Sequence, residues 1–267
     1  YIMTKKYMVT SGFLGSGKTT SMIAFAVSIN SRGLGSAAIL ANDLGAGNIV
    51  DAEFTATTGI KTLPISGNCI CYQHENAGAD IIFSDIPGCG IGALDHVYLE
   101  LNDKENGQFT LMPFMCIVDP ERIKMIMPQG EDINLPEEMK FLLDAQMAEA
   151  DIIVLNKIDT ISDAEADNII GFIKENYPAV PVMAISALKG TGVDNVVDYI
   201  LSSKAAAVHK EIGYGSDAFV AAESRLSWFN TRIFMEQRED KNIDFNDVIY
   251  DIFEEKKKCA SPQNVCG

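Results

Sequence analysis

The stretch VTSGFLGSGKTTSM, residues 9–22, indicates the fold class of this chain. It fits the pattern G-x-x-x-x-G-K-[ST], with Gly12, Gly17, Lys18 and Thr19 at the fixed positions. The apolar run before it predicts a strand, and residues 18–31 after it predict a helix, which is the context that this pattern requires. Glycines let backbone N–H groups turn inward, and the start of a helix adds positive potential. The stretch therefore predicts a loop that binds the phosphates of a nucleotide.

Each side chain of this loop has an expected role. Lys18 should reach the β- and γ-phosphates, and the Thr19 hydroxyl should bind Mg²⁺. The residues expected to contact the nucleotide here are Gly12, Gly15, Ser16, Gly17, Lys18, Thr19 and Thr20.

The choice of base is predicted by DIIVLNKID, residues 151–159, where a strand ends in the N-K-x-D pattern of Asn156, Lys157 and Asp159. A carboxylate at Asp159 can accept hydrogen bonds from guanine N1–H and the 2-amino group. Adenine offers neither donor, and an unpaired charge is costly, so the pattern favours GTP. The Lys157 stem can lie along the base, and a loop of Ser186, Ala187 and Leu188 can close over it through its backbone.

Two further segments are expected near the γ-phosphate. Asp85 ends an apolar strand and begins the D-x-x-G pattern that Gly88 completes. Its carboxylate can hold Mg²⁺, directly or through water, and the Gly88 N–H can sense the γ-phosphate. Asp43 ends another strand and can bind Mg²⁺ or orient the attacking water; the alternative is a loop-capping role. The catalytic candidates are thus Lys18, Asp43 and Asp85.

The segment LPISGNCICYQHENAG, residues 63–78, contains a C-x-C-x-x-H pattern. Cys69, Cys71 and His74 are three soft or borderline ligands within six residues, a spacing that suits a transition metal. Cys89 is a candidate fourth donor directly after D-x-x-G. The alternatives are two partly buried cysteines beside a surface histidine, or a redox dithiol, which C-x-C spacing strains. Cys116, in contrast, lies in a strongly apolar run and is expected in the core.

Strand and helix patterns alternate along the chain up to residue 204. Apolar β-rich runs predict strands at residues 7–10, 37–41, 80–84, 111–118, 151–155 and 180–185, and helical patterns occupy 18–31, 137–150, 162–177 and 193–203. This alternation predicts an α/β domain, residues 1–204, with a mostly parallel sheet covered by helices on both faces, as in P-loop NTPases. Residues 205–267 lose the strand pattern and predict a short helical C-terminal appendage that covers core or binds a partner.

The composition limits which partners and which cellular location are expected for this chain. With 21 Lys and Arg against 37 Asp and Glu, the net charge is −16, which argues against nucleic acid as the main partner. No apolar run is long enough for a membrane helix. The six cysteines in a chain with ample core indicate a reducing, cytoplasmic location rather than disulfides.

Together these motifs resemble the CobW/HypB/UreG family of metal-handling GTPases in the SIMIBI class of P-loop proteins. GFLGSGKTT resembles the phosphate loop of CobW proteins, ANDLG their Asn-Glu/Asp-x-x-Gly segment, GNCICY their GCICC metal motif and CIVDPERI their VVDA strand. Three departures stand out. Tyr72 replaces the third cysteine, Asp85 stands where glutamate is usual, and the tail is shorter and more helical than the α/β domain of CobW proteins.

The resemblance implies a GTP-driven metallochaperone that delivers Zn, Ni or Co to a client metalloenzyme or corrinoid protein. The alternative is a metal-free GTPase switch that guards such a client; an ATP-dependent kinase or ligase is a third reading. No arginine finger is evident in the sequence, so we expect slow hydrolysis, about 10⁻⁴–10⁻² s⁻¹, until a partner or a GTP-dependent homodimer completes the site.

Overall fold

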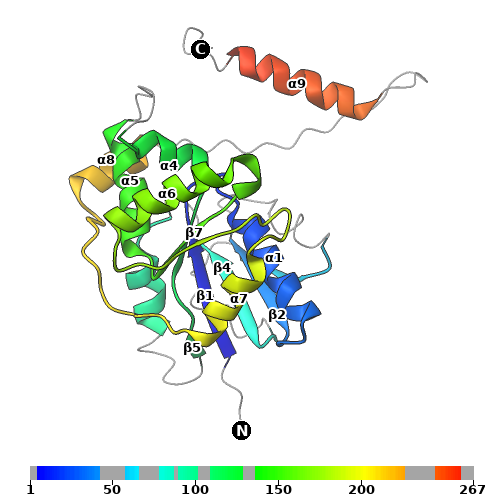
Figure 1. Ribbon diagram of the computed structural model, residues 1–267, viewed down its shortest axis with the longest axis vertical. Helices are drawn as coiled ribbons and strands as arrows, with labels where there is room; N and C mark the ends of the chain where they lie inside the picture. Colours follow the sequence, from blue (N-terminus) through cyan, green and yellow to red (C-terminus); the bar gives the residue numbers. More distant parts are fainter. Residues whose placement is uncertain are drawn as a thin grey trace. The chain divides into compact units, whose positions relative to one another are not determined.

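The structure is a computed structural model that describes residues 5–42, 58–65, 78–86, 90–101, 109–128, 136–225 and 244–259 (Figure 1). The chain divides into two compact units, Tyr1–Trp228 and Phe229–Gly267. Among the described helices, none has the length and apolar character needed to span a bilayer.

The first unit is built on a parallel sheet, which confirms the predicted α/β P-loop NTPase fold. The described strands are β1 (Lys5–Ser11), β2 (Ala37–Asn42), β3 (Lys61–Ile65), β4 (Ile81–Asp85), β5 (Phe109–Leu111), β6 (Met115–Val118), β7 (Ile152–Leu155) and β8 (Val182–Ala184). Their order is β3-β2-β4-β1-β6-β7-β8, with β5 also paired to β1, and every one of these pairings is parallel.

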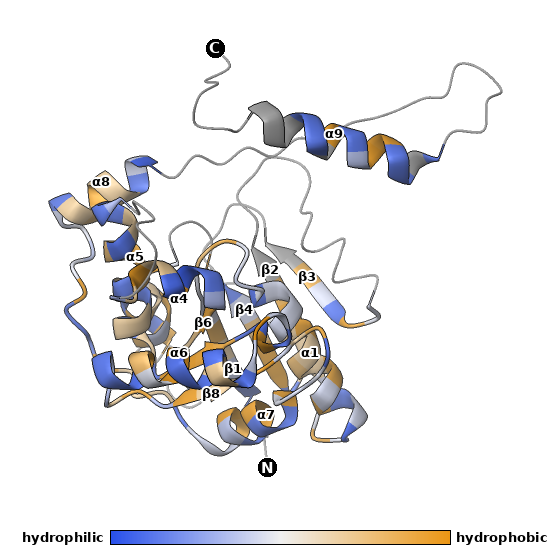
Figure 2. Cartoon of the chain, turned by 45° about the horizontal axis from the view of Figure 1, so that its top comes forward, coloured by the Kyte–Doolittle hydropathy of each residue, from blue (hydrophilic) through white to orange (hydrophobic). Residues whose placement is uncertain are grey.

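Helices cover both faces of this sheet. The helical elements of the unit are α1 (Lys18–Ser31), the π-helix η3 (Leu94–Leu99), α4 (Pro120–Ile126), α5 (Glu137–Glu149), the 3₁₀ turn η4 (Ile158–Thr160), α6 (Asp163–Asn176), α7 (Val193–Ser202) and α8 (Asp217–Arg225). On one face α1 and α7 pack against alternate strand residues such as Met8, Ile39 and Val154. On the other face η3, α5 and α6 pack against the residues between them. Hydrophobic residues accordingly fill the strands in Figure 2, as expected for strands buried on both faces.

The observed elements differ from the predicted ones in several places. The run 111–118 is not one strand, because Pro113 separates β5 from β6. The sequence pattern missed β3, an end strand of the order above that contains Pro64, and prolines are tolerated in such edge strands. It also missed η3 and α4.

The predicted domain boundary after residue 204 lies within the first unit. Helix α8 packs on α5, where Ala222 and Phe219 contact Leu142 and its neighbours. The second unit contains α9 (Phe245–Cys259), a helix within residues 205–267, for which the sequence predicts helical structure.

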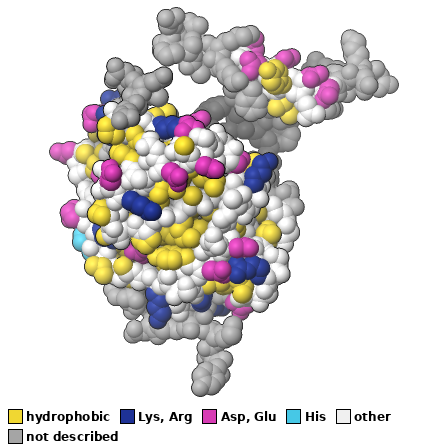
Figure 3. All heavy atoms as spheres, in the orientation of Figure 1, with side chains coloured by type: hydrophobic (Ala, Val, Ile, Leu, Met, Phe, Trp, Pro, Cys, Tyr) yellow, Lys and Arg dark blue, Asp and Glu magenta, His cyan; other side chains and the backbone are white. Residues whose placement is uncertain are grey.

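The surface of the first unit is mixed in character. The face shown in Figure 3 carries a hydrophobic area bordered by acidic and basic side chains, and the Lys and Arg side chains in view lie apart from one another. Two of the exposed large hydrophobic residues, Leu14 and Leu188, come from loops that are described next.

Candidate nucleotide site

The phosphate loop joins β1 to α1 and adopts a backbone shape that glycine alone fits. Gly12, Gly15 and Gly17 have φ angles of 133°, 81° and 95°, in the region that side chains other than glycine rarely adopt. A Cβ on Gly12 would lie 2.1 Å from the carbonyl oxygen of Ile117, and one on Gly17 would lie 2.3 Å from Nδ2 of Asn156. The glycine spacing of the motif is therefore required by both the turn and its neighbours.

The polar groups of the loop fit a phosphate chain. Lys18 begins α1, and its Nζ donates to the carbonyl oxygen of Gly12 at 2.9 Å. The buried hydroxyl of Ser16 has no hydrogen-bond partner among the described residues. Thr19 and Thr20 follow in the first turn of α1, where backbone N–H groups lack partners within the helix. A cradle of amides, a cation and an unsatisfied hydroxyl together suit an anionic ligand.

Asn156, at the end of β7, connects the phosphate loop to the loop after β8. Its Nδ2 donates to the carbonyl oxygen of Ser16 at 3.0 Å, and its Oδ1 accepts from the N–H of Ala187 at 3.0 Å. The side chain is buried, with 3% of the residue exposed. Both of its polar ends are thus used, and three segments far apart in sequence are fixed around one amide.

The next residues of the N-K-x-D pattern extend this connection. Lys157 has a positive φ of 62°, and its Nζ donates to the carbonyl oxygen of Gly15 at 2.6 Å. Asp159 follows in η4 and is exposed, so its carboxylate is accessible to a ligand. The structure therefore brings the phosphate loop and the N-K-x-D turn into direct contact.

The loop after β8 is held in a narrow turn. The Ser186 N–H donates to the carbonyl oxygen of Thr191 at 3.0 Å, and the Ser186 hydroxyl accepts from the N–H of Lys189 at 3.1 Å. Leu188 at its tip is 75% exposed, and Leu14 of the phosphate loop is 58% exposed. The side chains of Leu14 and Leu188 are thus both exposed to solvent, on two loops that hydrogen bonds of Asn156 connect.

Asp85 lies at the carboxyl end of β4, beside the strand that leads into the phosphate loop. It pairs in register with Thr10 of β1, and the next N–H, of Ile86, donates to the Thr10 carbonyl oxygen at 3.2 Å. Carboxylate and hydroxyl oxygens, as in Asp85 and Thr19, are the ligands that Mg²⁺ prefers. Asp85 and Thr19 are the residues that would hold Mg²⁺, which would neutralise negative charge there.

Several predicted site residues lie outside the described residues: Asp43, Gly88, Cys69, Cys71, His74 and Cys89. Within the ranges that are described, no group of three or more His, Cys, Asp or Glu could hold a metal ion. Cys116 is fully buried in β6, as predicted, and burial raises the pKa of its thiol to about 12.

The sequence patterns missed an ion pair beside the phosphate loop. Asp119, the N-cap of α4, is buried and accepts from Nη1 of Arg122 at 2.9 Å. The guanidinium carbon of Arg122 lies 5.4 Å from the centre of the Phe13 ring. The sequence VDPER carries a signal for the cap, because an aspartate before a proline often starts a helix. It carries no signal for the contact with the loop.

The sequence patterns also missed how residues 90–101 are held. They are here called the post-sensor segment because they follow the D-x-x-G pattern, whose Gly88 is expected to sense the γ-phosphate. The buried carboxylate of Glu149 accepts from the N–H groups of Gly92 at 2.9 Å and Leu94 at 2.8 Å. Burial raises the pKa of Glu149 to about 7, although the two N–H donors oppose that rise. The segment therefore depends on a carboxylate that is costly to ionise.

Residues 209–214, in the connection between α7 and α8, also contact the post-sensor segment. His209 Nδ1 lies 2.9 Å from Oδ1 of Asp95, which raises the pKa of the imidazole. The His96 ring lies 4.9 Å from the ring of Tyr214. Lys210 Nζ donates to the carbonyl oxygen of Glu149 at 2.9 Å. The connection between α7 and α8 thus contacts the segment at Asp95 and His96, and α5 at Glu149.

Comparison with solved structures finds several partial resemblances. Hydrogenase maturation factor HypB from Archaeoglobus fulgidus is 16% identical, with a TM-score of 0.48 over 74% of this chain and 90% of that one. HypB from Helicobacter pylori in complex with nickel is 12% identical, with a TM-score of 0.49 over 85% and 93%. Zn(II)-bound YjiA GTPase from E. coli is 16% identical, with a TM-score of 0.40 over 64% and 54%.

A comparison with curated proteins found no significant match. The family model described as CobW/HypB/UreG, nucleotide-binding domain, matches residues 6–184, a span that contains the phosphate loop, Asp85 and the N-K-x-D turn. This chain therefore belongs to the CobW/HypB/UreG family through its nucleotide-binding domain.

Proposed function

We propose that this chain binds GTP with Mg²⁺, hydrolyses it slowly, and couples its nucleotide state to the binding and delivery of a transition metal. The observation that carries the nucleotide part is the pair of links from the N-K-x-D turn to the phosphate loop. Asn156 bonds Ser16, and Lys157 bonds Gly15, so a base held at Asp159 and phosphates held at Lys18 fit one molecule.

In this proposal each element has one task. Lys18 and the loop amides bind the β- and γ-phosphates, Thr19 and Asp85 hold Mg²⁺, and the loop from Ser186 to Leu188 closes over the base. Asp43 and Gly88 respond to the γ-phosphate. Because two apolar leucines are exposed at this site, a client or a second copy of the chain has an apolar surface to contact.

The metal part is supported by the family and by ligand spacing. Cys69, Cys71 and His74, with Cys89 as a fourth donor, would bind Zn²⁺, Ni²⁺ or Co²⁺ as cargo for a client metalloenzyme or corrinoid protein. Since Tyr72 occupies the place of a third thiolate, His74 or Cys89 has to complete the site.

The nucleotide part is tested by isothermal titration with GDP and ADP in the presence of Mg²⁺. We expect GDP to bind at least about 100-fold more tightly, because adenine leaves the Asp159 carboxylate unpaired. Equal affinity for ADP would favour an ATP-dependent kinase or ligase instead.

The metal part is tested by titrating each metal into anaerobically purified protein with a slowly hydrolysed GTP analogue. The double variant Cys69→Ser/Cys71→Ser should lose tight binding, whereas Cys116→Ala, which removes the buried thiol, should retain it. Unchanged metal affinity in the double variant, with GDP binding intact, would leave the metal-free switch as the function.

A further inference from the structure

Arg122 lies against the phosphate loop. Its guanidinium carbon is 5.4 Å from the centre of the Phe13 ring, and a Cβ on Gly15 would lie 3.3 Å from its Nη2. Lys157 reaches the carbonyl oxygen of the same Gly15. Two cations, Arg122 of α4 and Lys157 after β7, therefore lie close to one residue of the loop.

Asp119 fixes the position of Arg122. Its Oδ1 accepts from the Arg122 backbone N–H at 3.3 Å, and its Oδ2 accepts from Nη1 at 2.9 Å. The Asp119 side chain is only 1% exposed, and a buried carboxylate has to be paired. The two residues are only three positions apart, and the Asp119 carboxylate is buried. The ion pair therefore restricts the guanidinium to a position beside the loop.

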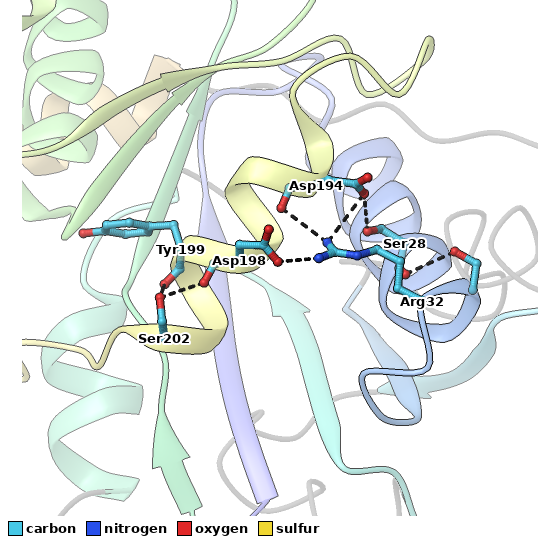
Figure 4. A network of polar contacts seen from close by, with 7 residues as sticks. Ser28, Arg32, Asp194, Asp198, Tyr199 and Ser202 are labelled. Carbon is cyan, nitrogen blue, oxygen red and sulfur yellow. Dashed lines mark hydrogen bonds and ion pairs between the residues drawn. The ribbon is translucent and has the colours of Figure 1, made fainter.

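A different arginine ion pair shows what a purely structural pair looks like in this fold. Arg32, at the end of α1, contacts Asp198 of α7 at 2.6 Å and Asp194 at 3.7 Å, and Ser28 donates to Asp194 (Figure 4). Both aspartates are mainly exposed, and the network links two helices. Arg32 and Arg122 are similarly exposed, at 32% and 26% of the side chain, so Arg32 is a matched control.

We propose that Arg122 is a positioning residue of the nucleotide site. Oriented by Asp119, it holds Phe13 and Gly15 in the shape that receives the diphosphate of a guanine nucleotide. This inference rests on the proposed function, because it concerns the affinity for the same nucleotide. Its charge also lies where it adds to the positive potential around the loop in a strongly acidic protein.

The experiment compares GDP binding and GTP turnover in Arg122→Ala, Arg122→Lys and Arg32→Ala. We expect Arg122→Ala to weaken GDP binding about tenfold, which equals about 1.4 kcal/mol. The KM for GTP should rise, whereas kcat should stay within about twofold of its original value. The reason is that the loop contact stabilises the ground state and the transition state equally. Arg122→Lys should recover part of the affinity, and Arg32→Ala should bind GDP as the unaltered chain does.

A double variant separates positioning from simple charge neutralisation. Arg122→Ala alone leaves the buried Asp119 carboxylate unpaired, whereas Asp119→Asn/Arg122→Ala leaves no buried charge and keeps a good N-cap. We expect the double variant to regain thermal stability but to remain about tenfold weaker for GDP. Recovery of GDP affinity in the double variant would show that Arg122 only neutralises Asp119, and would overturn the proposal.

Two further outcomes separate this proposal from the one on which it rests. If the unaltered chain binds GDP but Arg122→Ala matches Arg32→Ala in affinity and KM, the positioning role is overturned and the nucleotide function stands. If the unaltered chain does not bind guanine nucleotides, both are overturned.

Discussion

The nucleotide site and the post-sensor segment are held in different ways. Around the phosphate loop, the amide of Asn156 fixes backbone groups of Ser16 and Ala187, and amides do not titrate. The post-sensor segment is held by Glu149, with a raised pKa, and by the His209–Asp95 pair. The hydrogen bonds of Asn156 should therefore be insensitive to pH, whereas the contacts that hold residues 90–101 should not.

The largest effect is expected from filling the space that Gly17 leaves. Gly17→Ala would place a Cβ 2.3 Å from Asn156 Nδ2, which disrupts the cradle at its central link. We predict at least about a 100-fold loss of GDP affinity, corresponding to about 2.7 kcal/mol or more, measured by titration.

Gly33→Ala is the matched control for that change. Gly33 has a similarly positive φ of 65°, but nothing lies within 4 Å of its Cβ position. It should lose only about 1–3 kcal/mol of stability through backbone strain and retain GDP binding. Equal losses of affinity in both variants would show that strain, not the contact with Asn156, explains the effect.

A smaller effect is expected from Asn156→Ala. The change leaves the Ser16 carbonyl and the Ala187 N–H without their buried partner, which costs about 1–3 kcal/mol for each group. We predict a lower midpoint in urea and GDP binding weakened by about 10- to 100-fold. The control Asn176→Ala removes one exposed hydrogen bond to Phe172 within α6. It should change the urea midpoint and the GDP affinity much less.

The cradle could be predicted from sequence because its residues are local. Lys18 and the glycines occupy one short motif, and Asn156 to Asp159 another, so spacing alone locates them. The contact between the two motifs needs the strand order, in which β6 separates β1 from β7. That strand order cannot be read from the sequence. A parallel sheet nevertheless places the carboxyl ends of all its strands at one edge, so the two motifs are expected on the same side.

The post-sensor segment could not be predicted in this way. Glu149 ends an ordinary amphipathic helix, and its partners, Gly92 and Leu94, lie more than 50 residues away. Nothing in the pattern of α5 separates this glutamate from the exposed Glu137 at its start. The same holds for Arg122, whose contact with Phe13 joins segments more than 100 residues apart.

The pH dependence of stability tests how Glu149 and His209 hold the post-sensor segment. The pKa of Glu149 is about 7 in the folded chain, above its ordinary value of 4.5, so the folded state binds this proton more tightly. Its contribution to the free energy of unfolding therefore decreases as pH rises from about 4.5 to about 7, by up to about 3 kcal/mol. His209 acts in the same direction, because its raised pKa adds stability that is lost as pH rises through it.

Glu149→Gln should flatten this slope. The amide oxygen can still accept a hydrogen bond but does not titrate, so urea unfolding between pH 4.5 and 7 should vary less than in the unaltered chain. Glu175→Gln, at an exposed position of α6, is the control and should keep the original slope. A slope unchanged by Glu149→Gln would assign the pH dependence to other groups.

The proposal that Asp159 and the phosphate loop together hold one guanine nucleotide can be tested by changing the base that the site prefers. Asp159→Asn replaces an acceptor-only carboxylate with an amide that can donate to a 2-oxo group, which xanthine has in place of the guanine 2-amino group. We predict that GDP binding weakens at least about 100-fold while xanthosine diphosphate becomes the tighter ligand. The exposed Asp163→Asn should retain the preference for GDP. Retained GDP affinity in Asp159→Asn, with no gain for xanthosine diphosphate, would contradict the account.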